Sequence, residues 1–181
     1  MQTHDLVAHA AHSPIAIRSV EARILSLTDS WMRVRWRING VENLVLPPFA
    51  GRGRADGLWR TTCFELFMMP KDGSGRYSEF NLSPSERWAA YDFAGYRKGQ
   101  DNRDMAREPD CTMRTGQAMA IFDAAFPRVQ MPEAPCAIGL SAVIEEAGGI
   151  KSYWALSHHK DQPDFHDPRS FTACIARTKA A

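Results

Sequence analysis

Three consecutive strand-like runs between residues 58 and 96 constrain the fold of this chain more than any other stretch. The first two runs flank residues 70–76, where a proline and two glycines interrupt the strand pattern and favour a turn. Because side chains along a strand point alternately to opposite faces, the apolar residues of each run fall on one face. These apolar residues are Phe64, Leu66 and Met68 in the first run and Phe80 and Leu82 in the second. The pattern predicts an antiparallel hairpin with one face in a core.

The opposite face of the same hairpin gathers polar and aromatic side chains. They are Trp59, Thr61 and Glu65 from the first run and Tyr77, Glu79 and Asn81 from the second. Glu65 and Glu79 are predicted to lie either diagonally or directly opposite each other, depending on the strand register. Like charges opposite one another destabilise a hairpin, so this arrangement favours a polar binding surface. The alternative is the solvated side of an ordinary antiparallel sheet.

The rest of the chain also reads as short strands. Residues 31–38 alternate apolar with charged side chains, and Asn39-Gly40 favours a tight hairpin before the next run. No stretch has the pattern of a long amphipathic helix. Roughly ten short strands separated by turns predict an all-β fold, an antiparallel β-sandwich with either a jelly-roll or an immunoglobulin-like topology. We expect one domain over residues 17–177, preceded by a flexible N-terminal arm over residues 1–16.

Composition excludes several classes of partner. A net charge of +1 over 181 residues argues against nucleic acid or an anionic membrane as the partner. No apolar run approaches the ~20 residues of a membrane-spanning helix, and the N-terminal residues lack the pattern of a secretory signal, so we expect a cytoplasmic protein. The four scattered cysteines favour reduced thiols over a zinc site.

A loop near the C-terminus is rich in histidine and aspartate. His158, Asp164 and His166 lie within residues 158–169, where imidazole and carboxylate groups suit a divalent metal. The alternative is the rim of a binding site, with these three residues as polar contacts. Tyr153, Trp154 and Phe165 would then supply apolar faces.

Five motifs carry a resemblance to a known family. They are residues 58–67 (LWRTTCFELF), 77–84 (YSEFNLSP), 88–91 (WAAY), 153–158 (YWALSH) and 163–166 (PDFH). Together they resemble the bacterial DOMON-like proteins, which are related to family 9 carbohydrate-binding modules within a superfamily of sugar- and haem-binding β-sandwiches. The resemblance extends from about residue 17 to residue 176.

The resemblance implies a ligand surface on the polar face of the hairpin. It places Glu65, Tyr77, Glu79 and Asn81 near the ligand. The aromatic rings that could hold a sugar are Trp59, Trp88, Tyr91 and Trp154. In haem-binding members methionine and histidine are axial ligands, for which Met68 or Met69 and His158 are the counterparts here.

We expect a non-catalytic small-molecule binding module that recognises a carbohydrate or sugar-like ligand and needs no cofactor. Three alternatives stay open: a structural or protein-interaction β-sandwich, which could dimerise through an exposed sheet face, a haem-binding module, and a glycoside hydrolase that uses Glu65 and Glu79. The predicted ligand-binding residues are Trp59, Glu65, Tyr77, Glu79, Asn81, Trp88, Tyr91, Trp154, His158, Asp164 and His166.

Overall fold

The structure, a computed structural model, describes residues 2–133 and 135–176, and it is all-β as the sequence predicts. Within these residues fourteen strands form one curled sheet. One half of the sheet contains β10 (Asp110–Thr115), β11 (Met119–Pro127), β3 (Trp31–Asn39), β2 (Ser19–Leu27) and β1 (Thr3–Ala8), in that order. The other half continues with β13 (Ile150–Ala155), β12 (Cys136–Glu146), β6 (Cys63–Pro70), β7 (Tyr77–Leu82), β8 (Arg87–Phe93) and β5 (Gly53–Arg54).

Three short strands and three 3-10 helices complete the described chain. The strands β4 (Leu44–Val45) and β14 (Ala173–Ile175) pair with β12, and β9 (Asp101–Asn102) pairs with β8. The helices are η1 (Leu58–Arg60), η2 (Arg128–Gln130) and η3 (Pro168–Ser170).

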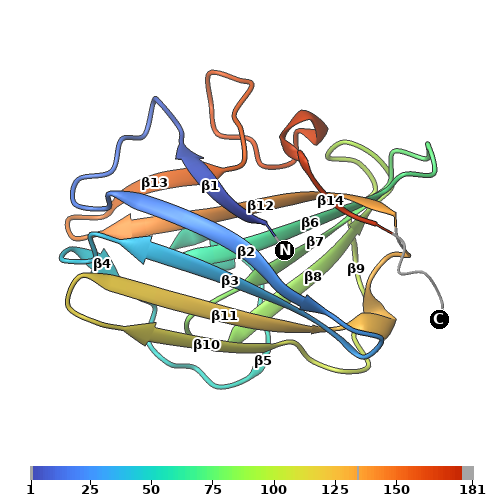
Figure 1. Cartoon of the computed structure of the whole chain (residues 1–181), viewed down its shortest axis with the longest axis horizontal. Coiled ribbons are helices and arrows are strands. Elements are labelled where there is room, and N and C mark those ends of the chain that lie inside the picture. The colour runs from blue at the N-terminus through green and yellow to red at the C-terminus, as the bar shows by residue number, and fades with distance from the viewer. Residues whose placement is uncertain (1, 134, 177–181) are drawn as a thin grey trace.

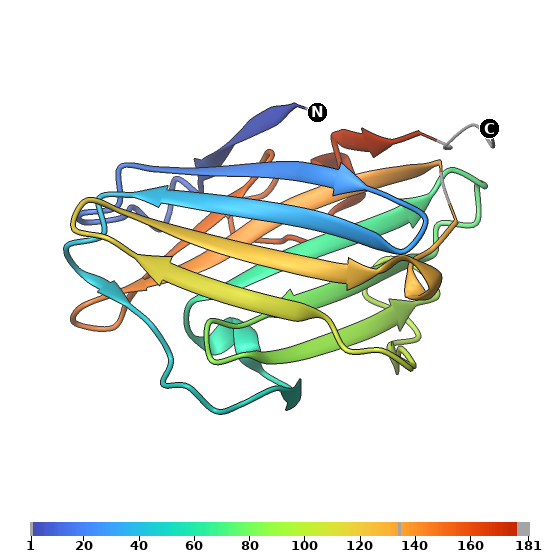
Figure 2. The ribbon, with the colours of Figure 1, turned by 60° about the horizontal axis from the view of Figure 1, so that its bottom comes forward.

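The strand β1 joins the two halves of the sheet. Its residues 3–6 pair with β2, whereas Val7 and Ala8 pair with β13. The sheet therefore turns over along β1, and β2, β3, β11 and β10 face β12, β6, β7 and β8 (Figures 1 and 2). This two-layered arrangement encloses the core.

The core between the two layers follows the predicted alternation. The even-numbered residues of β3 and the predicted apolar sets of β6 and β7 are all buried there: Met32, Val34, Trp36, Ile38, Phe64, Leu66, Met68, Phe80 and Leu82. Phe64 from one layer stacks on Phe122 from the other, with ring centroids 4.2 Å apart. Stacked aromatic pairs add to the free energy gained by burying apolar area, so this contact joins the layers.

The outer face of β6, β7 and β8 is also covered. A second apolar cluster there contains Phe67, Tyr77 and Phe171, and Phe171 comes from the segment that follows β13. The Phe171 ring lies over Gly139 of β12, where a Cβ atom would come within 2.5 Å of the ring. Only glycine leaves this space, so the ring can stack on Phe67 with centroids 5.4 Å apart. The segment over residues 156–172 thereby becomes a second cover on the sheet.

The structure corrects the expectation of a flexible arm over residues 1–16. Residues 3–8 form β1, and Leu6 is buried in the core. The carboxylate of Glu146 then accepts hydrogen bonds from the backbone N–H groups of Ile15, Ala16 and Ile17 at 2.8, 2.6 and 3.3 Å. A six-residue strand with one core side chain has too short an apolar pattern to be recognised from sequence alone. Residues 1 and 177, the outer ends of the predicted arm and domain, lie outside the described residues.

Two further expectations need correction. The chain over residues 58–60 is a 3-10 turn instead of the start of a strand, because Gly57 adopts a left-handed conformation with φ of 70°. The sheet is also not wholly antiparallel, since β5 runs parallel to β8. The strand number exceeds the expected ten because β4, β5 and β9 are pairings of only two residues each and β1 lies within the predicted arm.

We predict that Glu146→Ala destabilises the fold substantially. The substitution leaves three backbone N–H groups without their charged acceptor, and a hydrogen bond to a charged group contributes about 1.5–3 kcal/mol. We expect the free energy of unfolding to fall by about 3 kcal/mol in urea denaturation. Glu145→Ala, a change at the partly exposed neighbouring position, is the matched control. Equal stability of the two variants would contradict the role assigned to Glu146.

Candidate functional site

A pocket of about 630 Å³ lies over the outer face of β6, β7 and β8. The strands of the sheet supply Glu65, Glu79, Asn81, Tyr91, Phe93, Val143 and Tyr153. The residues from the surrounding loops are His12, Trp59, Arg97, Gln100, Gln162, Pro163, Phe165 and His166. Charged, amide and aromatic groups therefore converge on one concave surface, which could hold a small molecule between polar and aromatic side chains.

Two carboxyl groups occupy the sheet side of the pocket. Glu65 lies opposite Asn81, and Phe67 lies opposite Glu79, so the two glutamates are diagonal neighbours on adjacent strands. The register left open by the sequence is thus settled. Asn81 Nδ2 donates a hydrogen bond of 2.8 Å to Glu79 Oε1, and Ser141 Oγ lies 3.5 Å from Glu65 Oε2.

Burial changes the protonation of both glutamates. Glu65 is only 3% exposed, and loss of hydration together with the nearby charge of Glu79 raises its pKa well above the ordinary value. Burial also raises the pKa of Glu79 to about 7, although the hydrogen bond from Asn81 and the charge of Arg97 oppose the shift. The pair therefore does not carry two full negative charges at neutral pH.

His166 lies beside this pair and is neutral near pH 7. Burial, followed by the charge of Arg97, lowers the pKa of His166 to about 4. The Tyr77 hydroxyl lies 2.8 Å from His166 Nδ1, and His166 Nε2 lies 3.7 Å from Glu79 Oε2. The hydrogen bond with Tyr77, which does not itself line the pocket, therefore orients the imidazole ring of His166.

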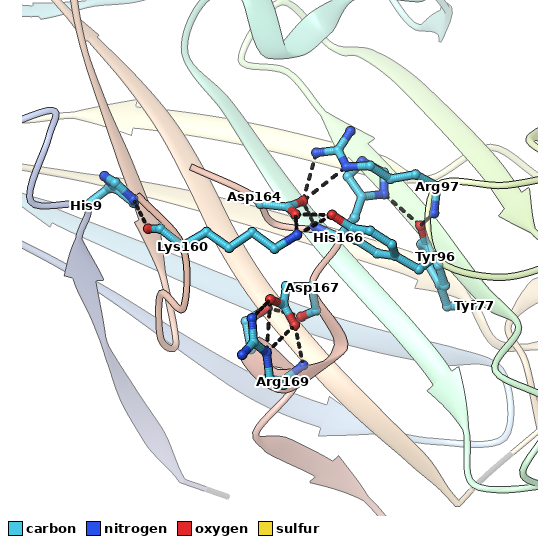
Figure 3. Close-up of polar contacts among 10 residues, drawn as sticks. His9, Tyr77, Tyr96, Arg97, Lys160, Asp164, His166, Asp167 and Arg169 are labelled. Atoms are coloured by element: carbon cyan, nitrogen blue, oxygen red, sulfur yellow. Dashed lines mark hydrogen bonds and ion pairs between the residues drawn. The ribbon is translucent and has the colours of Figure 1, made fainter. Parts of the chain in front are cut away.

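Arg97 is fixed at the edge of the pocket by Asp164. Its Nη2 and Nε donate hydrogen bonds to Asp164 Oδ1 at 2.8 and 3.2 Å, and Lys160 Nζ contacts Asp164 Oδ2 at 2.5 Å (Figure 3). The Tyr96 hydroxyl contacts the same carboxylate. Burial alone would raise the pKa of Asp164, but the hydrogen bonds from Lys160, Tyr96 and Arg97 lower it well below its usual range. This aspartate remains ionised and positions the guanidinium.

Aromatic side chains form the apolar parts of the pocket. Trp59 is 52% exposed, so its ring is accessible to a ligand. Tyr153 and Phe165 are neighbours with ring centroids 6.1 Å apart. The Tyr91 hydroxyl donates a hydrogen bond of 2.6 Å to Asp56 Oδ1, which holds the ring in place on β8.

The structure brings together most of the predicted site residues. Six line the pocket, namely Trp59, Glu65, Glu79, Asn81, Tyr91 and His166. Two more contact pocket residues without lining the pocket themselves: Tyr77 is hydrogen-bonded to His166, and Asp164 accepts hydrogen bonds from Arg97. Tyr153 and Phe165 lie at the site, as the alternative of a binding-loop rim predicts.

Three predicted residues lie elsewhere, which corrects their assignment. Trp88 and Trp154 are buried in the core between the layers, because each shares the inward face of its strand. His158 is outside the pocket, with Nε2 2.9 Å from the Val7 carbonyl oxygen. Of the two methionines considered for haem, Met68 is in the core and Met69 packs against the cluster around Phe67.

Several residues that line the pocket were not predicted from the sequence. Arg97 and Gln100 belong to a charged segment without strand pattern, and His12 lies in the presumed arm. No sequence signal identifies these three, since loop packing alone brings them to the site. Phe93 could have been found, because it shares a strand face with Tyr91.

The described part of the chain contains neither a cluster of side chains that could bind a metal nor a membrane-spanning helix. Among residues 2–133 and 135–176, no three histidine, cysteine, aspartate or glutamate side chains are grouped so that they could hold a metal ion. In the same residues there is no helix with the length and apolar character needed to cross a membrane.

Comparison with known proteins identifies similar folds. No family model matches the sequence, and no curated protein matches it. A proposed carbohydrate-binding protein from Bacteroides uniformis superposes with a TM-score of 0.64 and 16% identity, covering 94% of this chain and 84% of the other. A family 9 carbohydrate-binding module from Caldicellulosiruptor kristjanssonii, solved with glucose, gives a TM-score of 0.60 and 7% identity, covering 98% and 87%. At these identities the likeness shows a shared fold.

We predict that Glu79→Gln changes the pH dependence of stability. The pKa of Glu79 is 4.5 in the unfolded chain and about 7 in the fold. The protonated side chain therefore contributes its full stability below pH 4.5, and this contribution is lost as the pH rises through 7. Relative to the native chain, the variant should gain about 3 kcal/mol of stability between pH 4.5 and pH 8.

The measurement is urea unfolding of both proteins across that range. His166 has the opposite linkage, since its lowered pKa costs stability as the pH falls from 6.5 toward 4. This cost is common to both proteins and largely cancels in the difference. A difference that stays constant with pH would show that the carboxyl of Glu79 is well hydrated.

Proposed function

We propose that this chain is a non-catalytic carbohydrate-binding module, a DOMON-like domain related to family 9 modules, and that its site is the pocket over β6, β7 and β8. The observation that carries the proposal is the convergence of buried hydrogen-bonding groups and an exposed aromatic ring in one concave site on a sheet face.

The polar groups of the pocket match the hydroxyl groups of a sugar. Each hydroxyl both donates and accepts hydrogen bonds. Glu65 and Glu79 supply acceptors, Arg97 supplies donors, and the amides of Gln100 and Gln162 supply both. Hydrogen bonds that involve charged partners contribute about 1.5–3 kcal/mol, enough to select one arrangement of hydroxyls over another.

The aromatic groups match the apolar faces of a pyranose ring. Trp59 presents a half-exposed indole ring, and the neighbouring rings of Tyr153 and Phe165 line the same pocket. Covering a large aromatic face on binding removes apolar area from water, which contributes about 25 cal/mol per Å². Stacking and hydrogen bonding thus act on the same ligand from different walls.

The fold comparison supports the proposal without specifying the ligand. The module from Caldicellulosiruptor kristjanssonii was solved with glucose, and the Bacteroides uniformis protein is a proposed carbohydrate binder. We extend carbohydrate binding to this chain because the pocket has the required polar and aromatic groups.

We predict saturable binding of a mono- or disaccharide that depends on Trp59. Isothermal titration with glucose, xylose, galactose, glucosamine and cellobiose is the measurement. Trp59→Ala should weaken the binding at least about tenfold, since a buried aromatic contact contributes more than ~1.4 kcal/mol. The matched control is Phe49→Ala, which removes an aromatic side chain that is 74% exposed and does not line the pocket.

Two results would count against the proposal. If no sugar in the panel binds, the structural or protein-interaction role becomes the better description of this fold. If a sugar binds equally to the native chain and to Trp59→Ala, its site lies elsewhere on the molecule.

A further inference from the structure

We infer that the preferred ligand of the pocket is an amino sugar, whose ammonium group lies between Glu65, Glu79 and Asn81. This inference rests on the proposed function and names the class of sugar. It follows from an excess of hydrogen-bond acceptors over donors on the sheet side of the pocket.

Three acceptor groups lie together on one face of adjacent strands. Asn81 is directly opposite Glu65 in the β6–β7 register, and Glu79 is two residues before Asn81 on the same strand. All three side chains therefore project from the outer face of the sheet, and all three line the pocket.

One of these acceptors has no partner. Asn81 is 1% exposed, and its Nδ2 donates to Glu79 Oε1, which turns its other atom away from that carboxyl. Asn81 Oδ1 is buried and makes no hydrogen bond. A buried carbonyl oxygen without a hydrogen-bond donor raises the free energy of the fold. A ligand that donates a hydrogen bond to Asn81 Oδ1 would remove this cost.

Within the described residues neither carboxyl group is in direct contact with a lysine or arginine side chain. Neither Glu65 nor Glu79 forms an ion pair with lysine or arginine there, and the nearest ring nitrogen belongs to His166, 3.7 Å from Glu79 Oε2. Arg97 is engaged by Asp164 through two hydrogen bonds. Burial keeps the pair short of two full negative charges, and a cation supplied by a ligand would stabilise the ionised form of the carboxyl groups.

An ammonium group fits these requirements better than a hydroxyl group. It carries three N–H donors and no acceptor, which matches two carboxyl groups and one carbonyl oxygen. Its charge also strengthens each hydrogen bond, since charge-assisted bonds are roughly twice as strong as neutral ones. A sugar carboxylate in the same place would meet like charge.

Titration calorimetry at pH 7 with ligands that differ in one group tests the inference. The probes are glucosamine, 3-amino-3-deoxyglucose and 6-amino-6-deoxyglucose, because the position of the amine on the ring is not fixed by the pocket. Glucose, N-acetylglucosamine and glucuronic acid are the neutral and anionic comparisons. At least one amino sugar should bind at least about tenfold more tightly than glucose, and glucuronic acid should bind most weakly.

Isosteric variants then locate the effect. Glu65→Gln and Glu79→Gln should each reduce the preference for the amino sugar over glucose, whereas Glu42→Gln, at an exposed position outside the pocket, should preserve it. The ranking of ligands by the native protein needs no variant, so the test stands even if a variant fails to fold.

The outcomes separate this inference from the proposed function. If glucose binds and no amino sugar binds more tightly, the amino-sugar preference is wrong and the carbohydrate site stands. If a preference exists but survives both glutamine variants, the ammonium group does not lie at these carboxyls. If neither neutral nor amino sugars bind, both the proposed function and the inference fail.

Discussion

Burial of β6, β7 and β8 on both faces is the constraint on which this structure depends. One face packs on the opposite layer through contacts such as Phe64 on Phe122, and the other lies under the segment that follows β13. The second cover requires the close approach of Phe171 to Gly139. Beside this apolar contact the same segment contributes Phe165 and His166 to the pocket, and Glu65 and Glu79 form the floor of the pocket. The pocket thus lies between a buried sheet face and the loops that cover it.

Two-sided burial also explains the limit of prediction from sequence. Alternation assigned Phe64, Leu66 and Met68 to the core and Glu65 and Glu79 to the other face, because each set differs in polarity from its neighbours. On β8 both faces are apolar, so alternation could not tell that Trp88 points to the core and Tyr91 to the pocket. Arg97 and His12 reach the site through loop packing, which has no period. Strand faces were predictable, and the loops that complete the site were not.

The charges of the site follow from the same burial. Loss of hydration moves Glu65, Glu79 and His166 toward their neutral forms. Asp164 remains ionised because three neighbouring groups donate hydrogen bonds to it. The pocket consequently has a weakly charged floor and a firmly charged edge. A ligand would be oriented by Arg97 at that edge and discriminated by the acceptors on the floor.

The double pairing of β1 has a consequence for how the chain reaches its native state. This strand is near the start of the sequence, yet one of its partners, β13, is near the end. During synthesis β1 leaves the ribosome long before β13, so the two layers cannot be joined along β1 until the residues between the two strands have been translated. Pairings so distant in sequence also slow folding, because a long loop must close before any contact compensates its entropy. Until β13 has been translated, the unpaired edge of the first layer is therefore exposed to aggregation.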